Sequence, residues 1–237
     1  MSAGPLTVDP CRGGGAWAGR LGRRDATMAA MTQLFKVHPV NPQRRLLERA
    51  AASLRDGGVI VYPTDSTYAL GCQLANKEAL DRIRSLRRTD VNHEFSLICR
   101  DLSQIASYAR VDNQAYRLIR CLTPGPFTFI LKATHEAPRR LQDPKKRSVG
   151  IRVPNHKITA ELLDVVGEPI VSSTLQLPGD DLPLTDPEEF RGLLEKRVDV
   201  IIDGGVCGVE PTTILDLSGP EIRLVRQGKG DASAILS

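Results

Sequence analysis

The stretch Val61-Tyr62-Pro63-Thr64-Asp65-Ser66-Thr67-Tyr68-Ala69-Leu70-Gly71-Cys72 decides the fold of this chain. Residues 59–62 read VIVY, an apolar run that predicts a buried strand. The loop that follows carries four hydroxyl side chains and the carboxylate of Asp65 within five residues. Loops that leave buried strands are where α/β sheets build binding sites, so this loop is suited to holding a small polar ligand. The alternative interpretation is a hydroxyl-rich turn that satisfies its own backbone.

Strands and helices alternate on both sides of this stretch. Residues 43–56 place leucine and alanine at helical spacing, and Gly57-Gly58 is a natural helix end. Patterns of this kind predict helices at 43–56, 76–88, 112–122, 157–166 and 186–196, and strands at 59–62, 94–99, 127–131, 148–153, 169–174, 199–203, 213–217 and 222–225. Many of these strands are uniformly apolar, which is typical of a mixed or largely parallel sheet with helices packed on it. The sequence therefore predicts a single α/β domain.

The composition excludes several classes of protein. The chain has 237 residues, of which 41% are hydrophobic, 25% charged and 4% aromatic, as in globular proteins rather than disordered, collagen-like or coiled-coil chains. No run approaches the ~20 apolar residues that a membrane helix needs. The five cysteines are scattered without a CxxC pair, which favours neither disulfides nor a metal site and is typical of the cytoplasm.

Residues 1–32 differ in character from the rest. They are rich in glycine and alanine and show no sustained apolar period, so we expect a disordered leader or an extension from an upstream start, with the domain at 33–237. Residues 1–35 hold four arginines against two aspartates, which accounts for half of the net charge of +4. The domain itself is nearly balanced, so any interaction with nucleic acid must depend on local clusters.

Basic residues gather in two places. In the helix expected at 76–88, Arg84 and Arg88 are four residues apart and should share a face near the helix end. Such a cluster is either a solvated helix end or a cradle for phosphate groups. A second, loop-like run could reach a polyanion or be a solvated loop. Its members are Arg139, Arg140, Lys145, Lys146 and Arg147.

The strand expected at 148–153 carries a cation on an otherwise small-residue face. Alternation places Ser148, Gly150 and Arg152 on one face and apolar residues on the other. An arginine there needs an anionic partner, which is either an internal carboxylate or a bound carboxylate or phosphate. The four histidines lack metal-ligand spacing, and no P-loop, GxGxxG or nucleophile elbow is present in the sequence.

Five segments resemble the threonylcarbamoyl-AMP synthase family, also called YrdC-like. Residues 61–72 are similar to its YPTET-x-YGLG motif, residues 123–131 to PGP-x-T-x-IL, and residues 148–156 to TVGVR-x-P-x-H. Residues 198–205 and 212–216 resemble VD-x-I-x-DGG and STV-x-D. The motifs occur in the family's order over about residues 33–230, and the departures described below resemble its YciO branch most.

This resemblance implies a twisted open α/β sheet with a large basic concavity. It also implies a reaction of L-threonine, bicarbonate and ATP, with magnesium, that yields threonylcarbamoyl-adenylate and pyrophosphate for the threonylcarbamoyladenosine modification of tRNA. No tightly bound, protein-ligated metal is expected. Such chemistry requires positioning and charge neutralisation rather than a covalent nucleophile.

Site roles follow from the resemblance position by position. Those for threonine binding fall on Thr64, Tyr68, Arg152 and Thr212. Those for nucleotide binding fall on Ser148, Thr174, Gln176 and Arg226. Arg87 stands where the family has the lysine of a Lys-x-Arg pair, and Arg88 is a candidate substitute for its arginine, so these two are the candidate catalytic cations.

The departures from the family pattern lie near the expected phosphates. Thr89 and Asp90 replace the arginine and the proline that follow the lysine position, and Arg100 stands where many members have a histidine. The family's Ser-x-Asn reads Thr174-Leu175-Gln176. Losing one arginine from a phosphate-transfer site can cost about 10³-fold in rate.

Three functions therefore compete on sequence grounds. The first is a threonylcarbamoyl-AMP synthase, active or weakened, and the second is another enzyme on the same scaffold that binds a nucleotide and a threonylcarbamoyl-like group. The third is a non-catalytic module that binds tRNA or double-stranded RNA through a basic concavity formed by Arg84, Arg88 and the basic run at 139–147. With 4% aromatic residues, RNA binding should depend on phosphates and therefore on salt.

Overall fold

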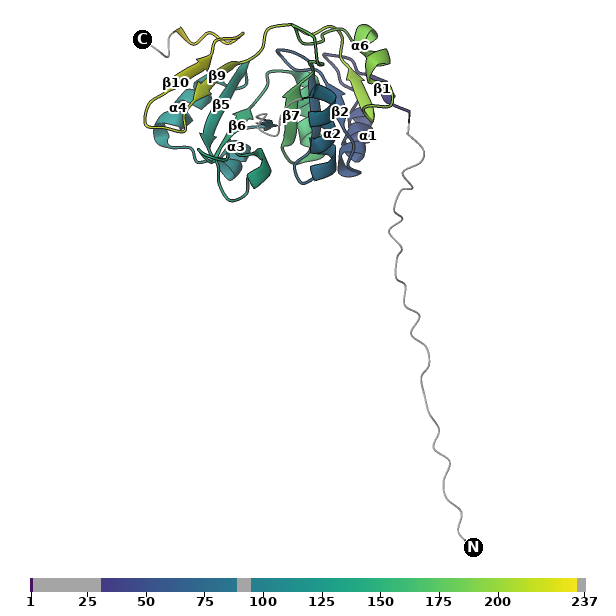
Figure 1. Ribbon diagram of the computed structural model, residues 1–237, viewed down its shortest axis with the longest axis horizontal. Coiled ribbons are helices and arrows are strands. Elements are labelled where there is room, and N and C mark those ends of the chain that lie inside the picture. Colours follow the sequence, from purple (N-terminus) through teal and green to yellow (C-terminus); the bar gives the residue numbers. More distant parts are fainter. Residues whose placement is uncertain (2–30, 89–94, 234–237) are drawn as a thin grey trace.

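The computed structural model describes residues 1, 31–88 and 95–233, and within these residues ten strands form one mixed sheet. The strand order is β1-β8-β2-β3-β7-β4-β6-β5-β9-β10, with β1 on the right and β10 on the left in Figure 1. The strands are β1 (Gln33–Lys36), β2 (Ile60–Tyr62), β3 (Ala69–Gln73), β4 (Ser96–Ile98), β5 (Phe127–Lys132), β6 (Ser148–Arg152), β7 (Ile170–Thr174), β8 (Val200–Asp203), β9 (Thr213–Asp216) and β10 (Arg223–Arg226). Four of the neighbouring pairs are parallel and five are antiparallel.

Six α-helices and one short 3-10 helix accompany the sheet in the described part of the chain. They are α1 (Arg44–Arg55), α2 (Lys77–Arg87), α3 (Leu102–Tyr108), α4 (Asn113–Leu122), η1 (Arg139–Leu141), α5 (Lys157–Val166) and α6 (Pro187–Leu194). Side chains of Asn76, Asp101, Asp112 and Asp186 accept hydrogen bonds from the first turns of α2, α3, α4 and α6. These caps satisfy backbone N–H groups that a helix start leaves without a partner.

The two faces of the sheet are covered differently. On one face, apolar side chains of α2, α3, α4 and α6 pack on alternate strand residues such as Val61, Leu97 and Phe129. On the other face, α1 and α5 pack on residues such as Tyr62 and Val200, toward the β1 half of the sheet. Toward the β10 half, that second face presents polar side chains to a cavity instead of to a helix. The uneven cover leaves room for a ligand over the centre of the sheet.

The expected single-domain α/β fold with a mixed sheet is confirmed. The helix expected at 157–166 has those bounds, and the other expected helices and strands lie within a few residues of their predicted positions. Strands β1 and β3 and helix α3 were not predicted, and β5 extends to Lys132. Among the described residues, no helix is both long and apolar enough to cross a membrane.

The tight approach of β3 to its neighbours depends on Gly71. A Cβ atom at this position would lie 2.7 Å from the Tyr62 ring and 2.8 Å from Ile170 Cγ2. The absence of a side chain therefore leaves room for the Tyr62 ring, whose hydroxyl donates to Ser172 Oγ. Residues 2–30 of the leader expected at 1–32, and the departures at Thr89 and Asp90, lie outside the described residues.

Candidate functional site

A cavity of about 350 Å³ lies over the middle of the sheet, on the face that α1 and α5 cover only in part. Its floor comes from β4, β5, β6, β7 and β9, and its rim comes from the end of α2, the loop after β7 and the end of β10. The predicted site residues among its lining are Arg87, Arg152, Thr174, Gln176, Thr212 and Arg226. Six positions that are far apart in the sequence thus meet in one hollow.

The hydroxyl-rich loop after β2 folds back on itself beside this cavity. The Thr64 hydroxyl donates to the Thr67 carbonyl oxygen at 2.6 Å and accepts from the backbone N–H groups of Ser66 and Thr67, both at 3.2 Å. The turn therefore satisfies its own backbone, and it also brings Thr64 Oγ1 to 3.4 Å from Arg152 Nη2. Thr67 lines the cavity, whereas Thr64 is not among its lining residues.

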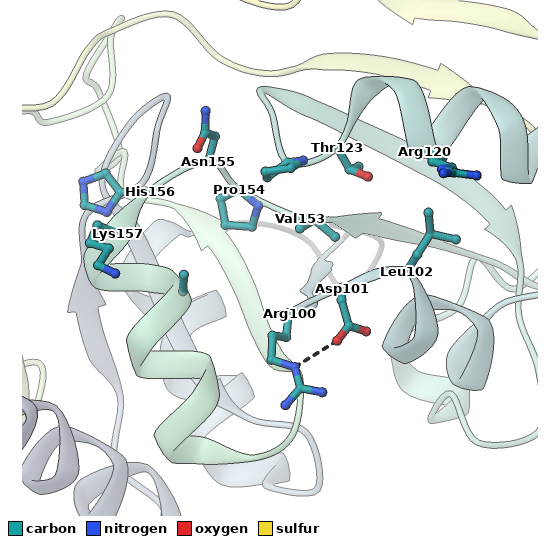
Figure 2. Close-up of a pocket in the computed structure, with 12 residues that line it drawn as sticks. Arg100, Asp101, Leu102, Arg120, Thr123, Val153, Pro154, Asn155, His156 and Lys157 are labelled. Atoms are coloured by element: carbon teal, nitrogen blue, oxygen red, sulfur yellow. Dashed lines mark hydrogen bonds and ion pairs between the residues drawn. The ribbon is translucent and has the colours of Figure 1, made fainter.

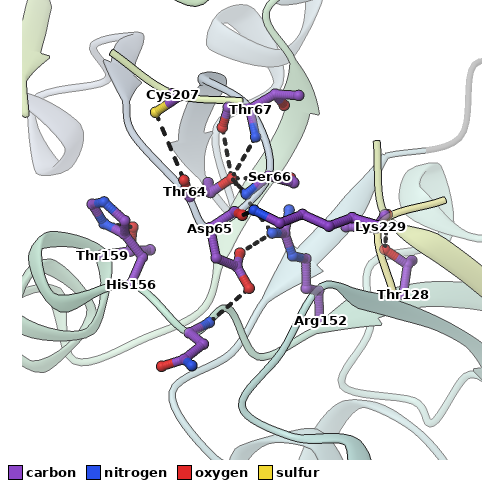
Figure 3. Close-up of polar contacts among 12 residues, drawn as sticks. Thr64, Asp65, Ser66, Thr67, Thr128, Arg152, His156, Thr159, Cys207 and Lys229 are labelled. Carbon is purple, nitrogen blue, oxygen red and sulfur yellow. Dashed lines mark hydrogen bonds and ion pairs between the residues drawn. The ribbon is translucent and has the colours of Figure 1, made fainter. Parts of the chain in front are cut away.

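Arg152 is held at the end of β6 by a buried ion pair with Asp65 (Figure 3). Their side chains are only 8% and 10% exposed, and the second carboxylate oxygen of Asp65 accepts the backbone N–H of Asn155 at 3.0 Å. Burial lowers the pKa of Arg152, and the nearby Asp65 carboxylate opposes that shift, so the guanidinium stays charged. Arg152 Nε is buried without a hydrogen-bond partner among the described residues. The arginine therefore has an internal carboxylate partner, and its side chain also lines the cavity.

Hydroxyl groups cover the floor of the cavity. The buried Tyr62 hydroxyl donates to Ser172 Oγ at 2.8 Å, and burial raises the pKa of this tyrosine. The hydroxyls of Thr128 and Thr212 lie 2.8 Å apart and form a hydrogen bond across β5 and β9. Neither Ser172 nor Thr128 was predicted as a site residue. The signal was present in the strand alternation, because both side chains lie on the face opposite the apolar core.

Two arginines reach the rim of the cavity from different sides. Arg87, the last residue of α2, donates from Nη1 to Ser173 Oγ, and burial lowers its pKa. Arg226, at the end of β10, donates from Nε and Nη2 to the carbonyl oxygen of Thr212 at 3.2 and 3.0 Å, and burial lowers its pKa too. These contacts place two fixed positive charges over a hydroxyl-lined floor, which suits a carboxylate or phosphate ligand.

The expectation that Arg84 and Arg88 share a helix face is wrong. Arg88 is the C-cap of α2 with a left-handed φ of 46°, so its exposed side chain leaves the helical spacing. Arg84 pairs with Asp81 at 2.9 Å and stacks over the Phe95 ring, 5.4 Å from its centroid. Among the described residues of this helix end, Arg87 alone lines the cavity.

Three other predicted positions have structural partners. Tyr68 is fully buried, and its hydroxyl donates to the Gly205 carbonyl oxygen at 2.7 Å and accepts the Gly204 N–H at 3.1 Å, so it holds the loop after β8 rather than lining the cavity. Ser148 is buried at the opposite end of β6, in register with Lys132, and does not line the cavity. Gln176 lines the cavity, but its amide donates to the carbonyl oxygens of Asp180 and Asp181 at 2.9 and 3.4 Å.

The basic run at 139–147 lies apart from this cavity. Arg139, Lys146 and Arg147 line a separate hollow of about 790 Å³ together with Arg110 and Lys132. Arg140 donates to the Leu74 carbonyl oxygen at 2.8 Å, and Lys146 pairs with Asp216 at 3.1 Å. Lys145 is exposed, with its backbone N–H bound to Asp143. The basic run therefore forms a surface that is separate from the cavity over the middle of the sheet.

A further cavity, of about 470 Å³, lies at the carboxyl ends of β4 and β6 (Figure 2). Arg100 lines it and pairs with Asp101 at 2.9 Å, so Arg100 does not lie among the cations of the first cavity. His156 is on its rim; burial lowers the pKa of this histidine, and its Nδ1 lies 3.3 Å from the Thr159 hydroxyl. No group of three or more His, Cys, Asp or Glu side chains that could hold a metal ion occurs in residues 31–88 and 95–233.

Comparisons with known proteins agree with this fold. Residues 52–228 match the family model described as "Telomere recombination", which covers Sua5, YciO and YrdC. The chain is 50% identical to YciO of Escherichia coli over 206 residues, which span 87% of this chain and 100% of that protein. The E. coli YciO crystal structure superposes with a TM-score of 0.82 over 86% of this chain and 98% of the other.

More distant relatives include synthases. A threonylcarbamoyl-AMP synthase of Halorhodospira halophila is 32% identical over 172 residues, 72% of this chain and 89% of that enzyme. The fold is also that of P. abyssi Sua5 crystallised with L-threonine, at a TM-score of 0.77 and 24% identity over 86% of this chain and 60% of the other. The resemblance seen in the sequence motifs is thereby confirmed. The chain belongs to the Sua5/YciO/YrdC family.

Proposed function

We propose that this chain is an enzyme of the threonylcarbamoyl-AMP synthase type, which joins L-threonine, bicarbonate and ATP into threonylcarbamoyl-adenylate and pyrophosphate. The product would serve the threonylcarbamoyladenosine modification of tRNA. The observation that carries the proposal is Arg152, a buried, charged arginine whose side chain lines a hydroxyl-rich cavity. The family membership and the synthase relatives support the same activity.

The threonine end of the site centres on Arg152. Its remaining donors would bind the carboxylate of threonine, because arginine recognises carboxylates with charge-assisted hydrogen bonds. Thr64, which lies beside Arg152, and Thr212, which lines the cavity, would form hydrogen bonds with the side chain and amine of threonine. Tyr68 would support this end indirectly by fixing the loop at Gly204 and Gly205.

The nucleotide would bind at the rim of the cavity. The amine of threonine adds to carbon dioxide derived from bicarbonate and loses a proton, which gives a carbamate. A carbamate oxygen then attacks the α-phosphorus of ATP, and the bond from that phosphorus to the pyrophosphate oxygen breaks. Arg87 and Arg226 would offset the negative charge that develops on the phosphoryl oxygens. Thr174 and Gln176 would contact the nucleotide, whereas Ser148, buried at the opposite end of β6, would not.

Magnesium would arrive with the triphosphate. Magnesium in nucleotide enzymes is held mainly by phosphate oxygens and water with one or two carboxylates. Asp181 is the carboxylate among the described lining residues, so the cavity fits a magnesium ion that the substrate itself carries better than a protein-built metal centre. Bound in this way, the ion would neutralise the leaving pyrophosphate.

The direct test is product formation. Purified protein incubated with ATP, magnesium, L-threonine and labelled bicarbonate should convert the label into threonylcarbamoyl-adenylate, identified by its mass. Arg152→Ala should abolish this product, whereas Arg45→Ala, an exposed position on α1, should leave it unchanged. If the protein binds ATP and threonine but forms no product, its synthase activity is altered or lost.

A second candidate function is binding of tRNA or double-stranded RNA. It is favoured by the separate hollow that Arg110, Lys132, Arg139, Lys146 and Arg147 line. Five cations around one hollow form a footprint for phosphates without requiring base contacts. This surface does not overlap the lining of the threonine and nucleotide cavity, so the two functions are compatible.

A further inference from the structure

The segment that follows β10 joins two parts of the site. Arg226, at the end of β10, lines the cavity and donates from Nε and Nη2 to the Thr212 carbonyl oxygen. Three residues later, the ammonium group of Lys229 donates to the backbone carbonyl oxygen of Asp65 in the loop after β2 (Figure 3). One short stretch of chain therefore contacts both the proposed nucleotide end and the proposed threonine end of the site.

Residues 226–230 are fixed against the chain that leads into β9. The Lys229 N–H donates to the Pro211 carbonyl oxygen at 2.9 Å, and the Gly228 N–H donates to Thr213 Oγ1 at 2.9 Å. This approach requires glycine at position 228, where a Cβ atom would lie 2.3 Å from the Pro211 carbonyl oxygen. The backbone at Lys229 therefore has a defined place, from which its side chain spans to the loop after β2.

Asp65 is the residue through which Lys229 acts on the threonine end. The Asp65 carboxylate forms the buried ion pair with Arg152 and accepts the Asn155 N–H, while its backbone carbonyl oxygen accepts the lysine ammonium. A hydrogen bond from a charged donor is roughly twice as strong as a neutral one. Lys229 therefore helps to set the position of the carboxylate that holds Arg152.

We propose that Lys229 is a positioning residue that couples the two ends of the site, so that a nucleotide bound at Arg226 raises the affinity for L-threonine at Arg152. The inference rests on the proposed function and deepens it, because it names the residue that connects the two substrates. A phosphate group that binds Arg226 orders residues 226–230, and Lys229 then holds Asp65 in place before threonine binds. The second ligand therefore loses less conformational entropy on binding, which gives positive coupling.

The test is isothermal titration calorimetry of L-threonine with and without saturating α,β-methylene-ATP and magnesium. This analogue cannot release pyrophosphate, because a methylene group joins its α- and β-phosphorus atoms. In the wild-type protein the analogue should raise the affinity for threonine about fivefold. Lys229→Met keeps an unbranched apolar side chain without the ammonium group, and it should reduce this increase to less than about twofold. Lys229→Arg restores a cationic donor and should recover most of the coupling.

The matched control is Lys77→Met, because Lys77 is an exposed lysine on α2 that lines neither the cavity nor the hollow at 139–147. It should keep the coupling of the wild type. A purely structural role of Lys229 would lower the threonine affinity equally with and without the analogue, and it would leave the coupling unchanged. Since Lys229 is exposed, its substitution should not impair folding, which the melting temperature checks.

Two results would overturn the inference while leaving the proposed function intact. One is a wild-type affinity for threonine that the analogue does not raise. The other is coupling in Lys229→Met that equals the coupling in the wild type. Failure of the wild-type protein to bind threonine even in the presence of the analogue would overturn the proposed function and this inference together.

Discussion

The guanidinium group of Arg152 and the carboxylate of Asp65 form a buried ion pair that ties the end of β6 to the loop after β2. The two residues are 87 positions apart in the sequence, and each belongs to a different motif. The pair fixes the arginine at the wall of the cavity while Nε remains without a partner among the described residues. Asp65 is therefore a positioning residue for the group that we assign to the threonine carboxylate.

Arg152→Ala and Thr64→Ala should remove the binding of L-threonine. The first removes the cation, and the second removes a hydroxyl that closes the turn beside it. Calorimetric titration of L-threonine measures the loss, and circular dichroism confirms that the chain remains folded. Arg152→Ala also leaves Asp65 buried without its cation, which should lower the melting temperature, since breaking a buried pair costs about 3–5 kcal/mol.

The matched control for this prediction is Arg82→Ala. Arg82 also forms an arginine–aspartate pair, with Asp199 at 2.8 Å, but it lies outside the cavity. This variant should lose some stability and keep threonine binding. Normal threonine binding by both Arg152→Ala and Thr64→Ala would show that the pocket lies elsewhere.

Gly71→Ala should destabilise the protein by about 1–3 kcal/mol, because overpacking of a tight site costs this much. The new methyl group would meet the Tyr62 ring and Ile170 at under 3 Å. Chemical denaturation measures the change in the free energy of unfolding. Gly192→Ala, on helix α6 with no atom within 4 Å of the new Cβ, should instead be neutral or stabilise by up to about 1 kcal/mol. Equal effects of the two substitutions would contradict the packing described for β2 and β3.

His156 should make the folded state sensitive to acid. Burial lowers its pKa in the folded protein below the ordinary value of 6.5, with Asp65 opposing and Arg152 reinforcing that shift. The unfolded chain then binds the proton more readily, so this residue's contribution to stability is present above pH 6.5 and is lost as the pH falls below it. The melting temperature of the wild type should therefore fall relative to that of His156→Gln on acidification. A constant difference from pH 8 to pH 5 would contradict the burial of this imidazole.

Binding of double-stranded RNA should depend on the basic surface at 139–147. Removing charge with Arg139→Gln and Arg147→Gln should weaken binding and lower the slope of log affinity against log salt by about 1–2, because each phosphate contact releases about one counterion. Filter binding between 50 and 200 mM salt would measure both effects. Arg45→Gln, on the exposed side of α1, is the control that should change neither. Binding that does not respond to salt would exclude this surface.

The sequence predicts most of the elements because their signals are local. Helix α5 is bounded as expected, since its apolar spacing is uninterrupted and Gly167 ends it with a positive φ of 80°. Strand β3 was missed because its five residues continue directly from the hydroxyl-rich loop and show no alternation. Residues of β1 form a strand because they pair with β8, which lies more than 160 residues away in the sequence.

The candidate site was predictable in its residue types and only in part in its geometry. Motif positions indicate Arg87, Arg152, Thr212 and Arg226, and the fold brings these four into one cavity. The same motifs do not predict that the Tyr68 hydroxyl donates to the loop after β8. A tyrosine at this motif position is compatible both with the wall of a pocket and with the core. The hydrogen bonds from the Gln176 amide to the carbonyl oxygens of Asp180 and Asp181 depend on how the loop after β7 closes, which no local pattern shows.

Pyrophosphate release by the purified protein, with ATP, magnesium, L-threonine and bicarbonate present and then omitted one at a time, tests the central claim most directly. We expect release that requires all of the components and that Arg152→Ala abolishes. Release without threonine or bicarbonate, or release that Arg152→Ala leaves unchanged, would contradict the assignment of this cavity to threonylcarbamoyl-adenylate synthesis.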